Sequence, residues 1–263
     1  MAQVPETLKN FIRKPLKLLG YQILKIKHQN EVWFPNELAH EEKKIVSYVL
    51  ENRLTMASFE RVVSTALAVR YVIQNQIEGD FVECGVWRGG NSIIAAKLVK
   101  LHESKKKIWL YDTFTGMTEP NGQETDMYGA NALHKFKTLP KDSTESQFWC
   151  ISSIEEVKNA FSSLDLLSDN VHFVQGDVSK TLEDEPKLPK KISVLRLDTD
   201  WYESTLKELE ILYPRLEKNG ILIIDDYGHW SGSRAAVEEY FSKLPNKPFL
   251  HPIDNTGRLA IKT

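Results

Sequence analysis

The sequence predicts an α/β fold: a Rossmann-like, mostly parallel sheet flanked by helices. Short runs of branched apolar residues, such as Ile221–Ile224, are typical of strands that helices cover on both faces. Helix-length segments with one apolar stripe alternate with these runs. Acidic residues or glycines follow the ends of the runs, and open parallel sheets bind ligands at that edge. We therefore expect the functional site at the carboxyl ends of the strands.

Composition limits the class of protein. A chain of 263 residues with 41% hydrophobic content suits a single α/β domain with extensions. With 34 basic and 36 acidic residues, nothing indicates a nucleic-acid-binding surface. Two cysteines, Cys84 and Cys150, make no disulfide framework and fit a reducing compartment. Without a bilayer-length apolar run or a signal peptide, we expect a soluble, cytoplasmic protein with no stable membrane association.

Residues 1–39 are predicted to form an arm that precedes the domain at 40–263. The arm begins as a basic, amphipathic segment, which Pro15 and Gly20 interrupt. It is suited to an anionic membrane surface, to a partner subunit or to covering the active site. The interruptions favour a subunit contact or a lid, and we expect a homodimer or a higher homo-oligomer.

Two amphipathic helices are predicted next, at His40–Leu54 and Ser58–Ile77, each with apolar residues at helical spacing. A short link from Thr55 to Ser58 joins them. This link either caps the second helix or approaches a cofactor. Thr55 and Met56 are therefore candidate cofactor contacts.

The segment Phe81–Ser92 (FVECGVWRGGNS) is predicted to be a strand and a glycine loop, which lead into a helix at Ile93–Leu101. Backbone amides and a helix N-terminus face a ligand in such a unit. The spacing E-x-G-x-x-x-G differs from the dinucleotide fingerprint G-x-G-x-x-G, which disfavours NAD. Alternatively, the glycines only serve a tight turn that needs positive φ. Candidate cofactor residues are Glu83, Gly85, Trp87, Gly89 and Ser92.

Acids also end the next two predicted strands. Ile108–Tyr111 runs into Asp112, which occupies the position of the acid that accepts bonds from ribose hydroxyls in α/β nucleotide sites. Val171–Val174 is followed by Asp177, whose carboxylate is placed to reach an adenine amino group. The first three strands together thus predict a nucleoside site.

Residues 116–150 are polar and irregular, and they follow directly after a predicted cofactor strand. Such an insertion suggests a lid over the substrate; the alternative is a tolerated surface loop. Ser153 and Glu156 then form a capping box that opens a structural helix.

Two acidic clusters end two further runs, Ser193–Asp200 and Ile221–Asp226, with a predicted helix at Glu203–Lys218 between them. A right-handed crossover makes the two strands parallel, so the acids converge if the strands are neighbours. Carboxylates alone suit a hard divalent ion, magnesium before manganese or calcium. Alternatively, the acids merely mark strand ends. The four acids are Asp198, Asp200, Asp225 and Asp226.

Arg196 is unusual because it lies inside an apolar strand. It either pairs with an acid at the sheet edge or buries its stem and keeps its head in water. After the second acidic cluster, a helix is predicted at Ser233–Leu244. Short runs near 250–253 and 258–262 predict a terminal hairpin.

Four stretches taken together resemble the macrocin O-methyltransferase family, which methylates sugar hydroxyls of macrolide and aminocoumarin antibiotics. The stretches are FVECGVWRGGNS, YDTFTGM, RLDTDWYEST and IIDDYGHW, and the resemblance covers roughly residues 40–262. It implies a class I methyltransferase fold with a seven-stranded sheet, S-adenosylmethionine as donor and a magnesium ion.

The resemblance also implies roles for individual residues. Asp198, Asp225 and Asp226 match the metal ligands, and Asp200 matches the proposed general base. Glu83 with the loop after it, Asp112 and Asp177 match the donor site. His229 is an alternative base or a residue that orients the substrate, although a solvent-facing loop histidine would look the same in sequence.

Three functions are weighed, the first of which is the one that the resemblance implies. The first is Mg²⁺-dependent methyl transfer to a sugar hydroxyl of a glycosylated small molecule, in which the ion stabilises a developing alkoxide and a base accepts the proton. The second is a catechol-type O-methyltransferase with a planar diol as acceptor. The third is a catalytically silent protein that binds S-adenosylmethionine; the paired acids disfavour it, because donor binding alone does not require them.

Overall fold

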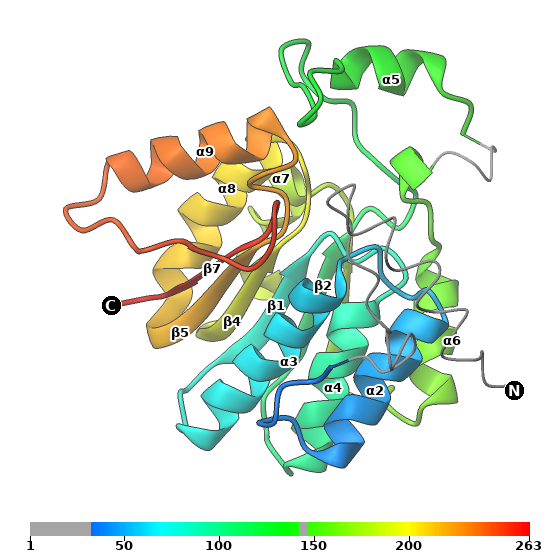
Figure 1. Cartoon of the computed structure of the whole chain (residues 1–263), viewed down its shortest axis with the longest axis vertical. Coiled ribbons are helices and arrows are strands. Elements are labelled where there is room, and N and C mark those ends of the chain that lie inside the picture. The colour runs from blue at the N-terminus through cyan, green and yellow to red at the C-terminus, as the bar shows by residue number, and fades with distance from the viewer. Residues whose placement is uncertain (1–32, 142–146) are drawn as a thin grey trace, which may run out of the picture. The chain divides into compact units, whose positions relative to one another are not determined.

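The computed structural model describes residues 33–141 and 147–263, and from Asn36 onward these residues belong to one compact unit (Figure 1). Most of the predicted arm at 1–39 lies outside the described residues. Among the residues that are described, no helix combines the length and the apolar composition that a membrane crossing requires.

The unit is built on a seven-stranded sheet in the order β3-β2-β1-β4-β5-β7-β6. Strands β1 to β5 are parallel, and β7 runs antiparallel to both of its neighbours. The strand bounds are β1 Asp80–Cys84, β2 Ile108–Asp112, β3 Val171–Gln175, β4 Ile192–Leu197, β5 Leu216–Ile224, β6 His251–Pro252 and β7 Arg258–Ile261. The predicted fold class and the predicted terminal hairpin are therefore confirmed.

The strand order places a topological switch point between β1 and β4. The chain runs outward from β1 to β3 and then returns to β4 on the other side of β1. In the centre of the sheet, Val82 is paired with Leu195, which in turn is paired with Leu222. The two strands that carry the acidic clusters are thus neighbours, as the convergence of their acids requires.

Helices cover both faces of the sheet (Figure 1). Helices α3 and α4 contact the sheet on one side with α2 packed on α4, whereas α7 and α8 contact it on the other with α9 packed on α8. The helix bounds are α2 His40–Glu51, α3 Phe59–Gln74, α4 Gly90–Leu101, α5 Ala132–Thr138, α6 Ile154–Ser163, α7 Val178–Thr181, α8 Tyr202–Leu212 and α9 Ser231–Ser242. Short 3₁₀ turns lie at Gln147–Trp149, Glu185–Lys187 and Tyr213–Arg215.

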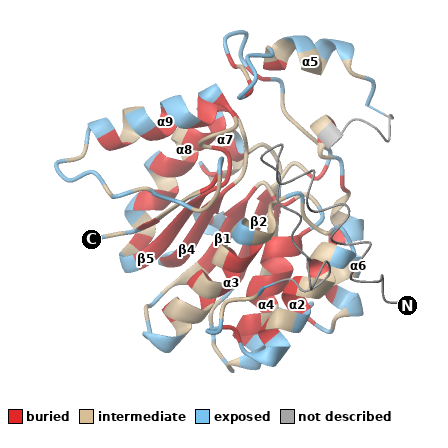
Figure 2. Ribbon diagram, in the orientation of Figure 1, coloured by how far each residue is buried: buried red, intermediate tan, exposed pale blue. Residues whose placement is uncertain are grey.

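The core lies between the sheet and these helices (Figure 2). Every residue of β4 is buried, including the two polar ones, Ser193 and Arg196. Helices pack on both faces of the strands and fix their positions. The positions of the residues that follow the carboxyl ends of the strands are therefore fixed as well.

Two predicted elements differ from the structure. The helix expected at Glu203–Lys218 ends at Leu212, because Pro214 lacks an N–H and cannot continue it. Strand β5 consequently begins at Leu216, five residues before the apolar run that predicted it. The insertion at 116–150, expected to be irregular, contains the short helix α5.

Candidate functional site

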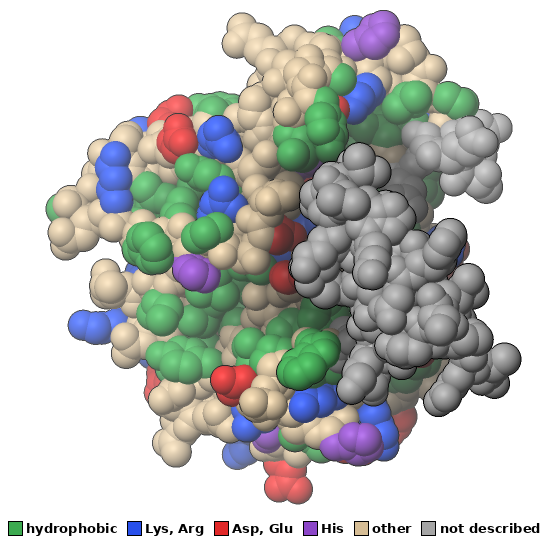
Figure 3. Space-filling model, viewed as in Figure 1, with side chains coloured by type: hydrophobic (Ala, Val, Ile, Leu, Met, Phe, Trp, Pro, Cys, Tyr) green, Lys and Arg blue, Asp and Glu red, His purple; other side chains and the backbone are tan. Residues whose placement is uncertain are grey.

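A cavity of about 460 Å³ opens at the carboxyl ends of the parallel strands. In Figure 3, acidic side chains are visible near the middle of the face shown, where the surface is hollowed. The insertion completes the lining with six residues, Gly116, Met117, Thr118, Lys135, Phe148 and Cys150. Twelve predicted site residues line the cavity: Thr55, Met56, Glu83, Gly85, Trp87, Asp112, Asp177, Asp198, Asp200, Asp225, Asp226 and His229.

Two predicted donor contacts, Gly89 and Ser92, are not among the described residues that line this cavity. Gly89 has a φ of +83°, and a Cβ there would lie 2.8 Å from the side chain of Val157 on α6. Ser92 is fully buried and donates a hydrogen bond to Glu83. Both residues therefore contact protein atoms outside the cavity and hold the glycine loop in place.

Gly85 brings the end of β1 against the end of β4. Its φ is +79°, and a Cβ at this position would lie 1.9 Å from the carbonyl oxygen of Asp198. Only glycine fits this approach without displacing backbone. The glycine loop and the first acidic cluster are therefore in contact.

The two acids of the predicted nucleoside half have backbone partners. Asp112 accepts hydrogen bonds from the N–H groups of Val86 (2.6 Å), Trp87 (3.0 Å) and Phe114 (2.7 Å). Asp177 caps α7 by accepting from the N–H of Ser179 at 2.9 Å. Asp112 thus orders the glycine loop, and the predicted contacts of both acids with a nucleoside stay predictions.

Asn91 lines the same half of the cavity although no sequence pattern singled it out. It is 3% exposed, and its Nδ2 donates to Thr55 Oγ1 at 3.4 Å. Its Oδ1 is buried and has no hydrogen-bond partner among the described residues. A buried acceptor of this kind requires a donor from a ligand or from water.

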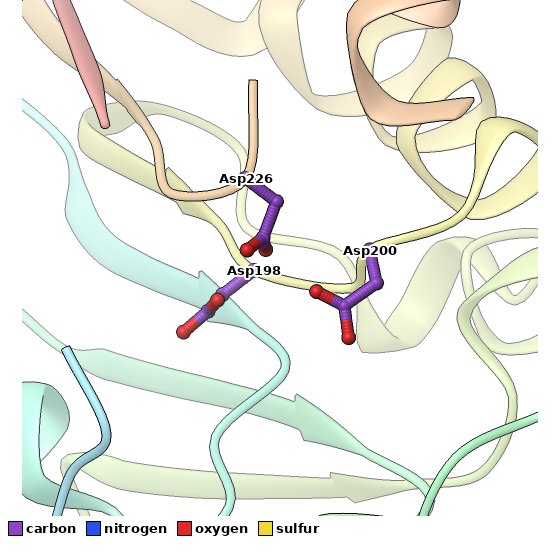
Figure 4. A group of neighbouring side chains, drawn as sticks. All are labelled: Asp198, Asp200 and Asp226. Carbon is purple, nitrogen blue, oxygen red and sulfur yellow. The ribbon is translucent and has the colours of Figure 1, made fainter. Parts of the chain in front are cut away.

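Three acids converge at the ends of β4 and β5: Asp198, Asp200 and Asp226 (Figure 4). One carboxylate oxygen of each lies within 4.8 Å of the others. Asp200 has a φ of +68°, and the N–H of Trp201 donates to the carbonyl of Thr199 across it at 2.7 Å. This is a γ-turn of the rare positive-φ type, a strained conformation that is concentrated at functional sites.

The electrostatics of the cluster favour a bound proton or cation. Burial raises the pKa of the Asp200 carboxyl to about 7, and the charges of Asp198 and Asp225 act in the same direction. The pKa of Asp226 is raised well above its usual value by burial and by the charges of Asp200 and Asp198. Its Oδ2 has no hydrogen-bond partner in the described parts of the chain. Such carboxylates hold a proton unless a cation joins them.

Asp225 lies between two guanidinium groups and is not part of this cluster. One of its oxygens accepts from Arg196, and the other accepts from Arg61 on α3. The pKa of Asp225 is raised to about 6, because burial outweighs the opposing charges of the two arginines, so the carboxylate is mostly ionised at neutral pH. The acids that the structure groups together therefore include Asp200, whereas the predicted ligand set includes Asp225.

The first of the two alternatives for Arg196 is the one observed. Its guanidinium is fully buried and donates to Glu83 at 2.9 Å, to Asp198 at 2.5 Å and to Asp225. These acids come from β1 and from the ends of β4 and β5. A buried cation with three acidic partners ties the three strand ends together.

Arg61 and Asp254 are site residues that sequence reasoning missed. Arg61 Nε lies 3.0 Å from Asp254 Oδ2, in the turn between β6 and β7, and Asp254 also accepts from the hydroxyl of Ser58 at 2.6 Å. These contacts join residues nearly 200 positions apart, and no local motif marks them.

His229 lines the cavity just beyond the acidic cluster. Its ring centroid lies 4.8 Å from that of Trp230. Burial lowers the pKa of the imidazole, so the ring is neutral near pH 7 and able to accept a proton. Both Asp200 and His229 therefore stay candidates for the base.

The chain is similar in sequence to known O-methyltransferases. The model of the macrocin-O-methyltransferase family (TylF) matches residues 14–260. The chain is 33% identical over 204 residues to 8-demethyl-8-(2,3-dimethoxy-alpha-L-rhamnosyl)-tetracenomycin-C 4'-O-methyltransferase of Streptomyces olivaceus, covering 77% of this chain and 73% of the relative. It is 34% identical over 209 residues to demethyldecarbamoylnovobiocin O-methyltransferase of Streptomyces niveus, covering 78% and 74%.

A solved structure shows the same similarity in three dimensions. The O-methyltransferase NovP superimposes with a TM-score of 0.68 at 32% sequence identity. The match covers 80% of this chain and 82% of NovP.

Proposed function

Because the chain belongs to the macrocin O-methyltransferase family, we propose that it methylates a sugar hydroxyl of a glycosylated small molecule, with S-adenosylmethionine as donor and Mg²⁺ bound. The family and the enzyme class, an S-adenosylmethionine-dependent O-methyltransferase, are those that the sequence predicted. The observation that carries the proposal is one cavity lined by both the glycine loop and the paired acids.

The half of the cavity near β1 to β3 fits the donor. It combines the glycine loop, the acids Asp112 and Asp177, and the unpartnered Oδ1 of Asn91. A cavity of about 460 Å³ is within the range of cofactor sites. We assign Asp112 and Asp177 as the residues that bind the nucleoside. We assign Asn91 as the residue that accepts a hydrogen bond from the methionine part of the donor.

The acidic cluster fits a hard divalent cation, since its donors are carboxylates and one buried oxygen lacks a partner. Following the family resemblance, we assign Asp198, Asp225 and Asp226 as ligands; Asp198 and Asp226 belong to the cluster, and Asp225 lies outside it. The arginines beside Asp225 keep it ionised, which is the form that a ligand needs. When bound, the ion supplies Lewis-acid stabilisation of the acceptor oxygen.

Asp200 is assigned as the general base. It lies within reach of both Asp198 and Asp226, where an acceptor hydroxyl would be held, and its pKa of about 7 suits proton acceptance near neutral pH. The γ-turn fixes the direction of its side chain. His229, neutral and in the same cavity, is placed to orient the acceptor.

The test is methyl transfer by the purified protein with S-adenosylmethionine and Mg²⁺. Demethyldecarbamoylnovobiocin and the rhamnosyl-tetracenomycin accepted by the relatives serve as sugar probes, and catechol serves as a planar diol. We expect a sugar probe to gain the mass of one methyl group as an ether, with no product in EDTA and no product with Asp198→Ala. Asp169→Ala, an exposed acid far along the chain from both clusters, is the matched control.

Each alternative has its own result in this experiment. Methylation of catechol alone would indicate the catechol-type enzyme. Binding of S-adenosylhomocysteine in calorimetry without turnover on any probe would indicate the silent binding protein. Activity that survives both EDTA and Asp198→Ala would refute the metal assignment.

A further inference from the structure

We propose that the acceptor sugar stacks on an aromatic wall formed by Phe148 and Trp230, and that Glu124 of the insertion sets the position of this wall. The inference rests on the proposed function and identifies where that function recognises its acceptor. The moiety recognised is a pyranose with an apolar C–H face on one side and hydroxyls at its edge.

The aromatic wall adjoins the acidic cluster. Phe148 and Trp230 both line the cavity, with ring centroids 6.3 Å apart and ring planes at 71° to each other, so that a sugar meets the face of one ring and the edge of the other. Behind them lies the buried ring of Trp201, 4.8 Å from Trp230 and 6.4 Å from Phe148. Trp201 directly follows Asp200 in the chain, so the wall packs on the residue next to the proposed base.

Glu124 attaches the insertion to this assembly. Its carboxylate is 3% exposed and accepts from the N–H of Tyr202, the first residue of α8, at 2.7 Å, and from the N–H of Asn121 at 3.1 Å. It thereby satisfies an N–H at the start of α8 that has no partner within the helix. A carboxylate at this end of a helix is also favoured by the helix dipole.

Further bonds join the insertion to the starts of α8 and α9. The indole of Trp201 donates to the carbonyl of Thr118 at 3.0 Å. Thr125 and Ser231 exchange two bonds of 2.9 Å, from the N–H of each to an oxygen of the other. The insertion, predicted as a lid, is thus docked on the two helices that follow the acidic clusters.

Gly232 shows how closely this docking is fitted. A Cβ at this position would lie 2.3 Å from Glu124 Oε1 and 2.8 Å from the N–H nitrogen of Tyr202. An alanine here would displace the carboxylate of Glu124 without altering any charge. Gly232→Ala therefore probes the position of the insertion separately from its chemistry.

The location of the wall indicates that it contacts the acceptor and not the methyl donor. The donor half is formed at the ends of β1 to β3, whereas the anchors of the insertion described above are on α8 and α9. Aromatic faces beside carboxylates suit a ring that has both apolar and hydroxyl surfaces. A sugar is such a ring, with its hydroxyl edge toward Asp200.

The test compares Phe148→Ala, Gly232→Ala and Glu124→Gln with the wild type. Phe249→Ala is the matched control, because Phe249 is 79% exposed and is not among the described residues that line the cavity. With demethyldecarbamoylnovobiocin as acceptor, we expect KM to rise about tenfold for Phe148→Ala and several-fold for the two anchor variants. The Kd for S-adenosylhomocysteine should change less than about twofold in all four.

A second readout does not depend on turnover. Methyl α-L-rhamnopyranoside, added to the protein with S-adenosylhomocysteine and Mg²⁺, should quench tryptophan fluorescence in the wild type and in Phe249→Ala. The quenching should weaken in Phe148→Ala. Thermal unfolding of each variant identifies any general loss of structure, and Glu124→Gln replaces Gly232→Ala if the latter does not fold.

The outcomes separate this inference from the proposed function. Methyl transfer with an unchanged acceptor KM in Phe148→Ala and in the anchor variants would overturn the inference alone. Equal losses of donor and acceptor affinity would also overturn it, since they indicate a structural role. No methyl transfer by the wild type, with quenching that depends on Phe148, would reject the proposed function and support the sugar wall; no quenching as well would overturn both.

Discussion

The two halves of the cavity differ in what their acids contact. In the donor half, Asp112 and Asp177 accept backbone hydrogen bonds, and in Asp112 these bonds oppose the rise in pKa that burial causes. In the acceptor half, Asp226 is buried beside the partly buried Asp200, and the pKa values of both carboxyls are raised. The first half is ordered by the chain itself, whereas the second is incomplete without a proton or a cation. The difference indicates that backbone hydrogen bonds preorganise the donor half. In the acceptor half, repulsion between neighbouring carboxylates favours the binding of a proton or a cation.

The largest expected effect is that of Asp200→Asn, which removes the proposed base and leaves the proposed ligands in place. We expect kcat to fall by about a hundred- to ten-thousand-fold. The affinity for Mg²⁺, measured by calorimetry, should change only a few-fold.

Asp225→Asn is the companion variant, and it should weaken Mg²⁺ binding instead. If Asp200→Asn abolishes Mg²⁺ binding and Asp225→Asn does not, the ligand set is the one that the structure groups together, with Asp200 as a ligand. The difference between the two halves would still hold, but His229 would then be assigned as the base.

Asp112→Asn tests the donor half. The amide would direct N–H groups at the backbone N–H groups of Val86 or Phe114, because Asp112 accepts bonds on both oxygens. We expect the Kd for S-adenosylhomocysteine to rise about 10- to 100-fold, since each buried donor left unpaired costs about 1–3 kcal/mol. Mg²⁺ affinity should be unaffected. A parallel loss of Mg²⁺ affinity would show that the two halves are not independent.

The pH dependence of stability tests the acceptor half without a substrate. The folded-state pKa of Asp200, about 7, lies above its value of about 4 in an unfolded chain. Its contribution to stability is therefore fully present below pH 4 and is lost as the pH rises through 7. In EDTA, Asp200→Asn should raise Tm by a few degrees at pH 8 and leave it nearly unchanged at pH 4.

Two further outcomes belong to that measurement. Mg²⁺ should raise the Tm of the wild type at pH 8, and this effect should fade below pH 7, because protons compete for the same carboxylates. A Tm difference between wild type and Asp200→Asn that does not vary with pH would contradict the raised pKa.

The smallest effect is expected for Glu208→Gln, a substitution at a fully buried acid of α8. Its carboxyl accepts from the hydroxyl of Thr199 at 2.8 Å, and burial raises its pKa well above the usual value, so the group is neutral. Glu208→Gln should therefore change stability by less than about 1 kcal/mol, whereas Glu208→Ala should cost about 2–4 kcal/mol through the cavity and the lost bond. Equal destabilisation by both variants in urea unfolding would contradict a neutral carboxyl.

The local sequence was sufficient to predict where the strands lie and in which order the motifs follow one another. A buried parallel strand needs apolar residues on both faces, and Ile221–Ile224 shows that requirement in four consecutive residues. The boundary of α8 was predicted less well, because Pro214 interrupts a segment whose apolar spacing continues beyond it. For the site, the sequence located the strand ends but not which acids meet.

What the sequence determined by itself is the fold class, the glycine loop and the two acidic clusters, because each depends on residues within a few positions of one another. Only the tertiary structure decided that Arg196 and Arg61 bind Asp225, that Asp200 turns toward Asp226, and that Glu124 caps α8. Those contacts join positions as much as 164 residues apart. They depend on side-chain directions that no periodicity encodes, so they become visible only when the sheet brings its strand ends together.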